Sequence, residues 1–331
     1  MRMFKRGLLP AAMRSLEKLA RSAGDNWWNE VLGTKDLLLA VRGGYLNAYV
    51  KGQSVFKIAF EKDERGGVQP RLAIHYKYLI KPSLEKKDPY ASFDGKAFAI
   101  DPATIVHTVY QSKLTLPQLI RTASGFAGPE KSGVHKIAQK EPKVVDLEIA
   151  FTLTGEDDSP SAPRMDIAVL VPDQTRGDVR LVFCEAKCAD NKELWELEDE
   201  SQWQQLAEPS ERRIAVVAQI EKYQTFIRNK AKDITRAYIE VCKTLVDLNR
   251  QYPSRNIDDL IEKVASGEAK LSIYPHVYLL VYDFDDDQKK GAVQKRRKDL
   301  IAKGIRVIAK GDPKSFSLAK DIMRQEDVKL E

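Results

Sequence analysis

Hydrophobic and polar residues alternate in short runs along residues 37–80, and this pattern predicts β-strands. Two-residue turn signals such as Gly43 and Gly44 separate the runs and are typical of hairpins. We therefore expect an antiparallel meander of about four strands in this region. Residues 12–33, which precede the meander, are expected to form a helix.

Beyond residue 113 the pattern alternates between helical and strand-like segments. Residues 116–140 are expected to be helical with a glycine-rich interruption, and Pro142 predicts that this helix ends before it. The clearest helix covers residues 213–250, where apolar residues recur at spacings of three, four and seven. A basic helix is expected at residues 287–303. The predicted strands are residues 143–155, 164–171, 179–187, 274–285 and 305–311.

This order of elements predicts an α/β fold with a mixed central sheet, in which an α-β-β-β-α-β core follows a smaller antiparallel β-rich domain. We expect two domains. Residues 1–112 would contain the N-terminal helix and the meander, and would bind the substrate or a partner protein. Residues 113–331 would contain the mixed sheet and the chemistry.

The composition is that of an ordinary soluble globular protein, with 43% hydrophobic and 31% charged residues. No run approaches the roughly 18 apolar residues that a membrane span requires. The basic N-terminus lacks the apolar run of a signal peptide. The three cysteines fit a reducing compartment and suggest no disulfide framework. We therefore expect a cytoplasmic protein with no membrane partner.

The net charge is only +6, but the basic residues are unevenly distributed. Residues 1–24 and residues 289–310 contain far more Lys and Arg than Asp and Glu. Basic segments of this kind favour a polyanionic partner such as nucleic acid. A solvated helix face explains each segment equally well, so charge alone does not identify the partner.

Residues 45–51 offer a candidate surface in the first domain. Tyr45, Asn47, Tyr49 and Lys51 alternate with apolar residues, so one face of this strand should be polar and aromatic. Aromatic rings beside basic side chains can stack on nucleobases and neutralise phosphates. A half-buried sheet or a protein interface is the commoner explanation of such a pattern.

Three ionisable residues stand inside two apolar strands of the second domain. Glu185 and Lys187 are two positions apart, so they share one face of their strand. Asp166 and Asp173 compete as the carboxylate that joins them. Turn-forming residues at 172–178 predict a hairpin in which Asp166 lies across from about Glu185. Asp173 would lie roughly 23 Å from Glu185 along the strand, so we choose Asp166.

Two buried carboxylates that face each other are unfavourable, because their charges repel and lose hydration. A divalent metal ion removes this penalty, and Mg²⁺ or Mn²⁺ prefers carboxylate oxygens and engages substrate phosphate. Asp166 and Glu185, with the backbone carbonyl of Ala186, are the expected metal ligands. Lys187 would hold or deprotonate the attacking water, or stabilise the developing negative charge. A buried salt bridge between Glu185 and Lys187 is the purely structural alternative.

The Asp, the Glu-x-Lys and the order of elements resemble the PD-(D/E)XK nuclease superfamily, whose core is α-β-β-β-α-β. The matching residues are Asp166 in "RMDIAVLV" and Glu185 and Lys187 in "VFCEAKC". Met165 stands where the family pattern has proline. The resemblance covers residues 113–331 and implies metal-dependent hydrolysis of phosphodiester bonds, with these three side chains in the catalytic site.

Gln219 and Tyr223 lie four positions apart on one face of the predicted helix. They match the Q-x-x-x-Y element of the RecB-like branch of the superfamily, which implies that both residues support the metal site. An ordinary core tyrosine with a surface glutamine is the alternative. The cysteine set of the iron–sulfur members of that branch is absent from the sequence, so no cluster is implied.

The family also places a further acid before the catalytic Asp, and the sequence leaves several options open. Glu148 lies in the first strand of the core, and Glu141 precedes Pro142 at the expected helix end. Glu130 lies in a segment interrupted by glycine and proline. Whether the site holds one metal ion or two depends on this acid.

We expect a Mg²⁺- or Mn²⁺-dependent nuclease that acts on DNA in preference to RNA, by either endo- or exonucleolytic cleavage. Enzymes of this resemblance serve restriction, phage defence, recombination and repair. The alternative is a catalytically inactive nuclease fold that binds nucleic acid or serves as a platform for partner proteins. The N-terminal domain is the expected protein-binding surface, and a homo-oligomer is compatible with the sequence.

Overall fold

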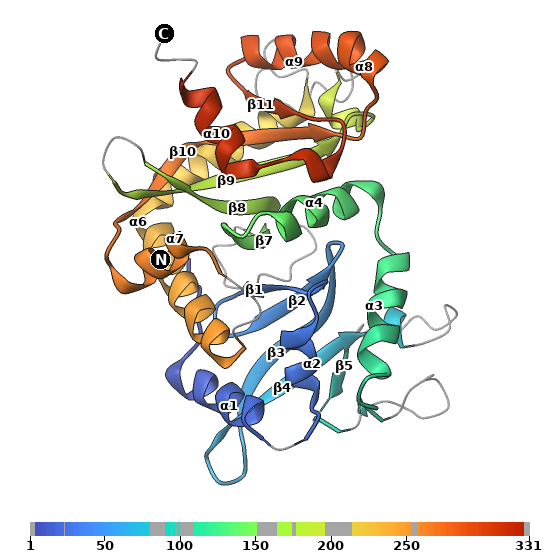
Figure 1. Ribbon diagram of the computed structural model, residues 1–331, viewed down its shortest axis with the longest axis vertical. Helices are drawn as coiled ribbons and strands as arrows, with labels where there is room; N and C mark the ends of the chain where they lie inside the picture. Colours follow the sequence, from blue (N-terminus) through green and yellow to red (C-terminus); the bar gives the residue numbers. More distant parts are fainter. Residues whose placement is uncertain are drawn as a thin grey trace. The chain divides into compact units, whose positions relative to one another are not determined.

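The computed structural model describes residues 4–22, 24–79, 90–93, 95–96, 98–99, 109–150, 164–173, 177–195, 214–252 and 257–327. The chain divides into two compact units, whose helices and strands are drawn in Figure 1. The N-terminal unit comprises residues 5–128 and 237–268, and the C-terminal unit comprises mainly residues 129–236 and 269–331. Among the described helices, none combines the length and the apolar character needed to cross a membrane.

The N-terminal unit contains an antiparallel sheet in which the described strands follow one another in sequence order. Its strands are β1 (Leu38–Val41), β2 (Leu46–Val50), β3 (Gln53–Lys62), β4 (Val68–His75), β5 (Tyr90–Phe93) and β6 (Phe98–Ala99). Each strand pairs with the next in antiparallel orientation. The predicted meander at residues 37–80 is therefore confirmed as β1 to β4, and β5 and β6 extend it.

Helices of the N-terminal unit include α1 (Pro10–Ala20), α2 (Trp27–Gly33), α3 (Thr115–Gly125) and α7 (Asp259–Ser266). The single helix predicted at residues 12–33 is wrong, because the chain turns between α1 and α2. Gly24 there adopts a φ of +87°, which ends the helical path. Asn26 then starts α2 anew, since its side chain accepts a hydrogen bond from the Asn29 N–H.

The polar and aromatic residues of β2 are engaged within the N-terminal unit. Asn47 and Tyr49 are only 5% and 7% exposed, and Asn47 Nδ2 donates to Tyr49 OH at 2.9 Å. The Arg42 guanidinium lies 5.8 Å from the Tyr49 ring, and Lys57 Nζ lies 4.6 Å from the Tyr45 ring. The half-buried sheet is therefore the better explanation for Asn47 and Tyr49, because buried side chains cannot stack on a nucleobase.

The expected domain boundary after residue 112 differs from the division into compact units. Helix α3 belongs to the N-terminal unit, because Leu116, Leu119 and Ala123 are buried where α3 packs on β2 and β3. The last part of α6 (Ala215–Gln251) also belongs to that unit. Sequence periodicity locates a helix, but it does not show which sheet the helix covers.

The C-terminal unit contains a mixed sheet in the order β11-β10-β9-β8-β7. Its strands are β7 (Val144–Ala150), β8 (Arg164–Pro172), β9 (Val179–Cys188), β10 (Leu271–Tyr282) and β11 (Arg306–Ala309). Strands β7, β8 and β9 pair in antiparallel orientation, whereas β9, β10 and β11 run parallel. The predicted strands are confirmed in this unit, and residues 151–155 of the first lie outside the described residues.

Two of the predicted helices are divided in the structure. Residues 116–140 form α3 and α4 (Pro129–Lys140), and the segment 126–128, which follows Gly125 and ends at Gly128, separates them. The basic helix at residues 287–303 is divided into α8 (Asp286–Lys290) and α9 (Ala292–Ala302). Gly291 breaks it, because its ψ of −110° is far from helical values. The long helix predicted at residues 213–250 is confirmed as α6.

Helices α4 and α10 (Leu318–Asp327) cover one face of the mixed sheet. Tyr282 and Tyr278 point to this face from alternate positions of β10. The Tyr282 hydroxyl donates to the Glu130 carbonyl of α4 at 2.6 Å, and the Tyr278 hydroxyl donates to Glu326 of α10 at 3.5 Å. Both helices are thus fixed to the sheet by polar contacts as well as by their apolar stripes.

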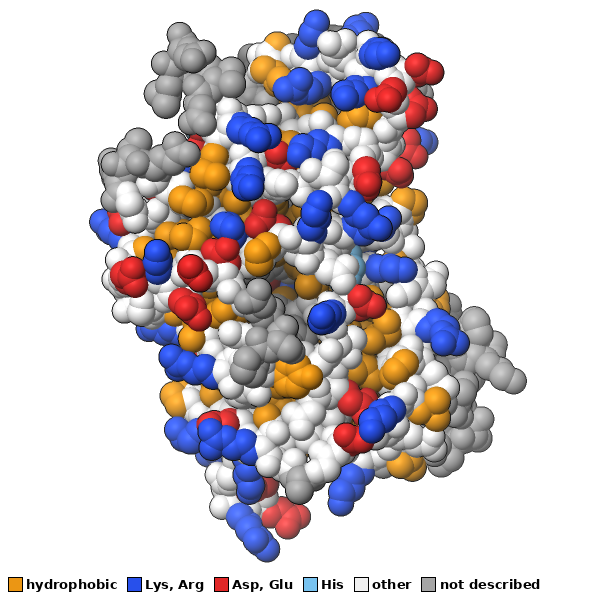
Figure 2. Space-filling view, in the orientation of Figure 1, with side chains coloured by type: hydrophobic (Ala, Val, Ile, Leu, Met, Phe, Trp, Pro, Cys, Tyr) orange, Lys and Arg blue, Asp and Glu red, His pale blue; other side chains and the backbone are white. Residues whose placement is uncertain are grey.

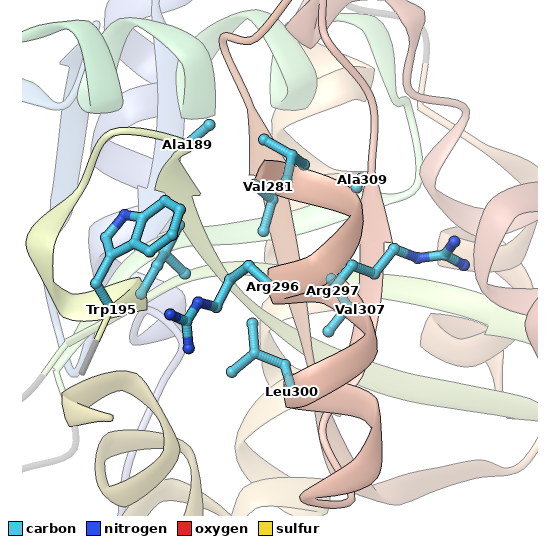
Figure 3. A pocket seen from close by; sticks show the side chains of 10 residues that line it. Ala189, Trp195, Val281, Arg296, Arg297, Leu300, Val307 and Ala309 are labelled. Carbon is cyan, nitrogen blue, oxygen red and sulfur yellow. The ribbon is translucent and has the colours of Figure 1, made fainter. Parts of the chain in front are cut away.

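The opposite face of the sheet carries α9 and the first part of α6. Val281 of β10 lines a small apolar pocket between the sheet and α9, together with Arg296 and Leu300, and Figure 3 labels these side chains. Val281 is also the register partner of Lys187 in the parallel β9–β10 pair, so both side chains point to this face. The described C-terminal unit therefore has a helical layer on each side of its mixed sheet.

Candidate active site

The β8–β9 hairpin brings the predicted aspartate and glutamate together. Ile167 pairs with Cys184, so the next position in this register places Asp166 across from Glu185. Asp173, the other candidate, lies at the turn end of the hairpin, beyond the last strand pair. The structure therefore places Asp166 beside the Glu-x-Lys, as the hairpin register predicted.

Asp166 is held from two sides and is only 3% exposed. Its Oδ2 accepts a hydrogen bond from the Ala186 N–H at 2.9 Å, which connects the start of β8 to β9. Its Oδ1 lies 3.0 Å from Nζ of Lys131, a residue in the first turn of α4. The backbone hydrogen bond orients the carboxylate and leaves Oδ1 as the oxygen that meets a cation.

Glu185 is 2% exposed, and only one of its two carboxylate oxygens has a partner among the described residues. Its Oε1 accepts a hydrogen bond from Gln219 Nε2 at 3.0 Å and lies 3.0 Å from Lys187 Nζ. Its Oε2 is buried and has no hydrogen-bond partner among the described residues. Burial and the charge of Asp166 raise the pKa of Glu185 well above its ordinary value, although Lys187 opposes the shift. A buried carboxylate oxygen of this kind is one that a metal ion or a water molecule can bind.

Lys187 lies between two glutamates. Its Nζ is 3.0 Å from Glu185 Oε1 and 2.6 Å from Glu193 Oε2. Burial lowers the pKa of Lys187, but the negative charge of Glu185 and the hydrogen bond to Glu193 outweigh burial, and the pKa lies above its ordinary value. Lys187 is therefore a cation at neutral pH, which can orient water or stabilise negative charge but cannot accept a proton.

Gln219 and Tyr223 of α6 form a chain of hydrogen bonds behind Glu185. Gln219 Nε2 donates to Glu185 Oε1 and also to the Tyr223 hydroxyl, each at 3.0 Å. The Tyr223 hydroxyl in turn donates to the Arg164 carbonyl at 2.7 Å. Tyr223 is 2% exposed, so it acts through its neighbours. The structure thus brings both predicted residues to the site, where they connect α6 to β8 and β9.

Glu148 is the acid on the first strand that reaches the site. Neighbouring pairs of the β7–β8 register place it across from Asp166, and its Oε1 lies 2.7 Å from Lys131 Nζ. Its φ of +49° is left-handed, which is unfavourable for a residue other than glycine and is often found at functional sites. Burial raises the pKa of Glu148, the Lys131 ammonium opposes that shift, and the net change is upward.

The other two candidate acids make different contacts. Glu141 accepts a hydrogen bond from the Ala319 N–H at 3.2 Å, next to the start of α10, and this is a structural role. Glu130 lies close enough to Lys187 to influence its pKa, but its side chain accepts a hydrogen bond from Asn191 Nδ2 at 2.6 Å. Of the three options that the sequence leaves open, Glu148 is therefore the one that shares a cation with Asp166.

Sequence pattern does not predict two members of this cluster, Lys131 and Glu193. Lys131 lies in the first turn of a helix, where a lysine is usually a surface residue. Its contacts depend on how α4 docks on the sheet, which no periodicity shows. Glu193 lies in the short 3₁₀ helix Lys192–Leu194 that follows β9. The sequence indicates a role for Glu193 only through its position, six residues after Lys187 in an acidic segment.

The side chains suit a hard divalent cation, although they do not form a complete ligand shell. Within the described ranges, no group of three or more His, Cys, Asp or Glu side chains converges closely enough to hold a metal ion. Glu148 and Asp166 share the Lys131 ammonium instead. Buried carboxylates on adjacent strands, one of them with an unsatisfied oxygen, are nevertheless the donors that Mg²⁺ and Mn²⁺ prefer.

A basic surface lies on the same face of the sheet as Lys187. The Arg296 guanidinium of α9 is 4.7 Å from the ring of Trp195, and Figure 3 shows the two side by side at the pocket. Trp195 lies two positions after Glu193, so this surface is near the cluster in the chain. Figure 2 shows Lys and Arg side chains over α8 and α9. The exposed basic residues of α9 are Lys295, Arg297 and Lys298.

Comparison with known proteins gave no match: no family model, no curated protein and no solved structure resembles the chain closely enough to be counted.

Proposed function

We propose that the protein is a divalent-metal-dependent nuclease of the PD-(D/E)XK type that hydrolyses phosphodiester bonds in DNA. The observation that carries this proposal is the cluster of Asp166, Glu185 and Lys187 on two paired strands, with Gln219 bonded to Glu185. The order α4, β7, β8, β9, α6, β10 supports the same type of core. Buried ionisable groups with shifted pKa values are also typical of functional sites.

Asp166 and Glu185 are the proposed metal ligands, together with the Ala186 carbonyl and with Glu148 as the further acid. Such an ion, when bound, lowers the pKa of a coordinated water and neutralises charge on the phosphate. The Ala186 N–H holds Asp166 in one orientation through Oδ2. Glu185 Oε2 is the oxygen that gains most from a cation, because no described residue is bonded to it.

Lys187 is the proposed residue that orients the attacking water and stabilises negative charge on the phosphate. Its raised pKa keeps it protonated, so the proton of the water must leave by another route, to solvent or to a phosphate oxygen. Gln219 fixes the Glu185 carboxylate, and Tyr223 fixes Gln219. These two residues position the site and do not touch the substrate.

A nucleic-acid substrate is supported by charge complementarity. The exposed basic residues of α9 and the stacked pair of Trp195 and Arg296 lie on the sheet face that carries Lys187. Phosphate backbones bind such surfaces through release of counterions, and an aromatic ring beside an arginine can stack on an unpaired base. We propose DNA in preference to RNA because of the family resemblance. A role in defence against foreign DNA or in repair is part of the same proposal.

A second candidate is a nuclease fold that binds nucleic acid without cutting it. The observation that favours it is Lys131, whose ammonium already neutralises part of the acidic cluster. An ammonium group between two carboxylates can hold them together without a metal ion. In that case the basic surface of α9 would still bind nucleic acid, but no divalent cation would bind to Asp166 and Glu185.

Cleavage assays separate the two candidates. Linear, circular and single-stranded DNA, and RNA, are incubated with the wild type in Mg²⁺, Mn²⁺ or EDTA. The nuclease proposal predicts cleavage that requires the metal and is abolished by Glu185→Gln. Asp173→Asn is the matched control, because Asp173 lies at the far end of the hairpin and should not affect cleavage. Cleavage that persists in EDTA would refute the metal mechanism, and binding without cleavage would favour the second candidate.

A further inference from the structure

Lys131 occupies the mouth of the acidic cluster. Its Nζ lies 2.7 Å from Glu148 Oε1 and 3.0 Å from Asp166 Oδ1. The Lys131 side chain is 33% exposed, whereas the Glu148 and Asp166 side chains are 7% and 4% exposed. The cation thus has access to solvent, and the two anions beneath it do not.

The charges of the cluster are not balanced by Lys131. The buried carboxylates of Glu148, Asp166 and Glu185, together with the more exposed carboxylate of Glu193, face only two ammonium groups, those of Lys131 and Lys187. A dication in place of Lys131 would reduce this excess of acidic groups.

The same oxygen of Asp166 is needed by Lys131 and by a metal ion. Oδ2 is committed to the Ala186 N–H, so Oδ1 is the oxygen left for a cation. A dication bound to Oδ1 at about 2.1 Å would lie within about 5 Å of an ammonium group that stays 3.0 Å from the same oxygen, and like charges at that separation repel in a partly buried site. Binding of the metal therefore disfavours the present position of Lys131.

Release of Lys131 does not require α4 to move. The backbone of this helix is anchored by the Tyr282 hydroxyl, which donates to the Glu130 carbonyl at 2.6 Å. Gly133 lies against the Tyr282 ring so closely that a Cβ at Gly133 would come within 2.2 Å of a ring carbon. The helix is thus held one residue before and two residues after Lys131, while the lysine side chain can rotate toward solvent.

We propose that Lys131 is a resident cation that a divalent metal displaces from Asp166 and Glu148, after which its ammonium binds the phosphate of the substrate. The proposal rests on the proposed nuclease function and adds a residue to it. Before metal binds, Lys131 holds the two carboxylates together through its ammonium group. After metal binds, Lys131 remains at the entrance, where the incoming phosphodiester carries the nearest unpaired negative charge.

Metal titration without nucleic acid tests the displacement. Mn²⁺ binding to the wild type, Lys131→Met, Lys131→Arg and Lys136→Met is measured by calorimetry. Lys136 is an exposed lysine of the same helix, so its variant controls for a general loss of charge. Lys131→Met should bind Mn²⁺ about tenfold more tightly than the wild type, since one competing ion pair is removed. Lys131→Arg and Lys136→Met should stay near the wild-type affinity.

A second measurement keeps the test decisive if Lys131→Met does not fold. The wild-type protein is acetylated briefly with and without Mg²⁺, and modification of each lysine is followed by mass spectrometry. Mg²⁺ should increase the modification of Lys131 and leave that of Lys136 unchanged. Equal or weaker Mn²⁺ binding by Lys131→Met, or Lys131 labelling that ignores Mg²⁺, would overturn the inference. Metal-dependent cleavage alongside that result would leave the nuclease proposal intact.

Discussion

Gln219 Nε2 donates a hydrogen bond to Glu185 Oε1 at 3.0 Å and so connects helix α6 to the central strand β9. The same amide donates to the Tyr223 hydroxyl, which is bonded to the Arg164 carbonyl of β8. One helix and two strands are thereby fixed around a single carboxylate. The Gln219 amide and the Lys187 ammonium both contact Oε1 and so orient this carboxylate, whose other oxygen has no partner in the described part of the chain.

Replacement of Gln219 by Leu should lower the free energy of unfolding by about 1–3 kcal/mol, because Glu185 and Tyr223 each lose a buried hydrogen bond. Tyr223→Phe should lower it by about 1 kcal/mol. In a double-mutant cycle measured by urea unfolding, the combined loss should fall short of the sum by about 0.5–1 kcal/mol. Additive losses would mean that Gln219 and Tyr223 do not act as a pair.

At pH 8 in EDTA, the free energy of unfolding of the Glu185→Gln variant should exceed that of the wild type by about 1 kcal/mol. Residues kept for function often lower the stability of the folded protein. The neutral amide removes both the burial of a charge and the repulsion from Asp166. The same variant should lose any rise in Tm caused by Mn²⁺. A variant that is less stable in EDTA and still responds to Mn²⁺ would argue against Glu185 as a ligand.

Stability of the metal-free protein should depend on pH through Glu185. The pKa of Glu185 in the folded protein is raised above 4.5, the ordinary value that applies to the unfolded protein. At a pH between the ordinary and the raised pKa, the folded protein therefore binds more protons than the unfolded protein. Linkage then requires that the Glu185 contribution to the free energy of unfolding falls as pH rises through this window and is level above it. Urea unfolding of the wild type and Glu185→Gln from pH 4.5 to pH 8 isolates this contribution. A pH-independent difference between the two proteins would contradict the raised pKa.

Lys187→Met should lower the single-turnover cleavage rate by about 10²–10³-fold, the usual effect of removing a charged group that acts on the transition state. DNA affinity measured in Ca²⁺ should change little, because Lys187 is buried between Glu185 and Glu193. Anisotropy of labelled DNA provides that control. Equal losses of cleavage and of affinity would instead identify Lys187 as a DNA-binding residue.

The basic surface of α9 should control affinity and not catalysis. Lys295→Ala combined with Arg297→Ala should weaken DNA binding and reduce the slope of log Kd against log salt by about 2, since two phosphate contacts are lost. Lys320→Ala is the matched control, because Lys320 is an exposed residue of α10 on the other face of the sheet. An unchanged salt slope in the double variant would place the DNA elsewhere.

The central pair of the site could be predicted from sequence because a hairpin links two residues that are close in the chain. Turn formers between two apolar runs fix the register, and the register places Asp166 across from Glu185. The spacing of Gln219 and Tyr223 was equally informative, since residues four apart share one face of a helix. Local geometry was sufficient for these four residues.

Contacts that depend on docking could not be predicted in this way. Lys131 meets Glu148 and Asp166 only because α4 lies where it does on the sheet. Helix α3 packs on the N-terminal sheet although it follows the expected boundary at residue 112. The break near Gly24 depends on one glycine in a left-handed conformation, which an apolar pattern across residues 12–33 does not reveal.

Anomalous diffraction from crystals grown with Mn²⁺ is the most direct test of a metal site at Asp166 and Glu185. The account predicts an anomalous peak within coordination distance, about 2.1–2.2 Å, of Asp166 Oδ1 and Glu185 Oε2, with Lys131 withdrawn from both carboxylates. Crystals at saturating Mn²⁺ with no peak there, and with Lys131 still between Glu148 and Asp166, would contradict it.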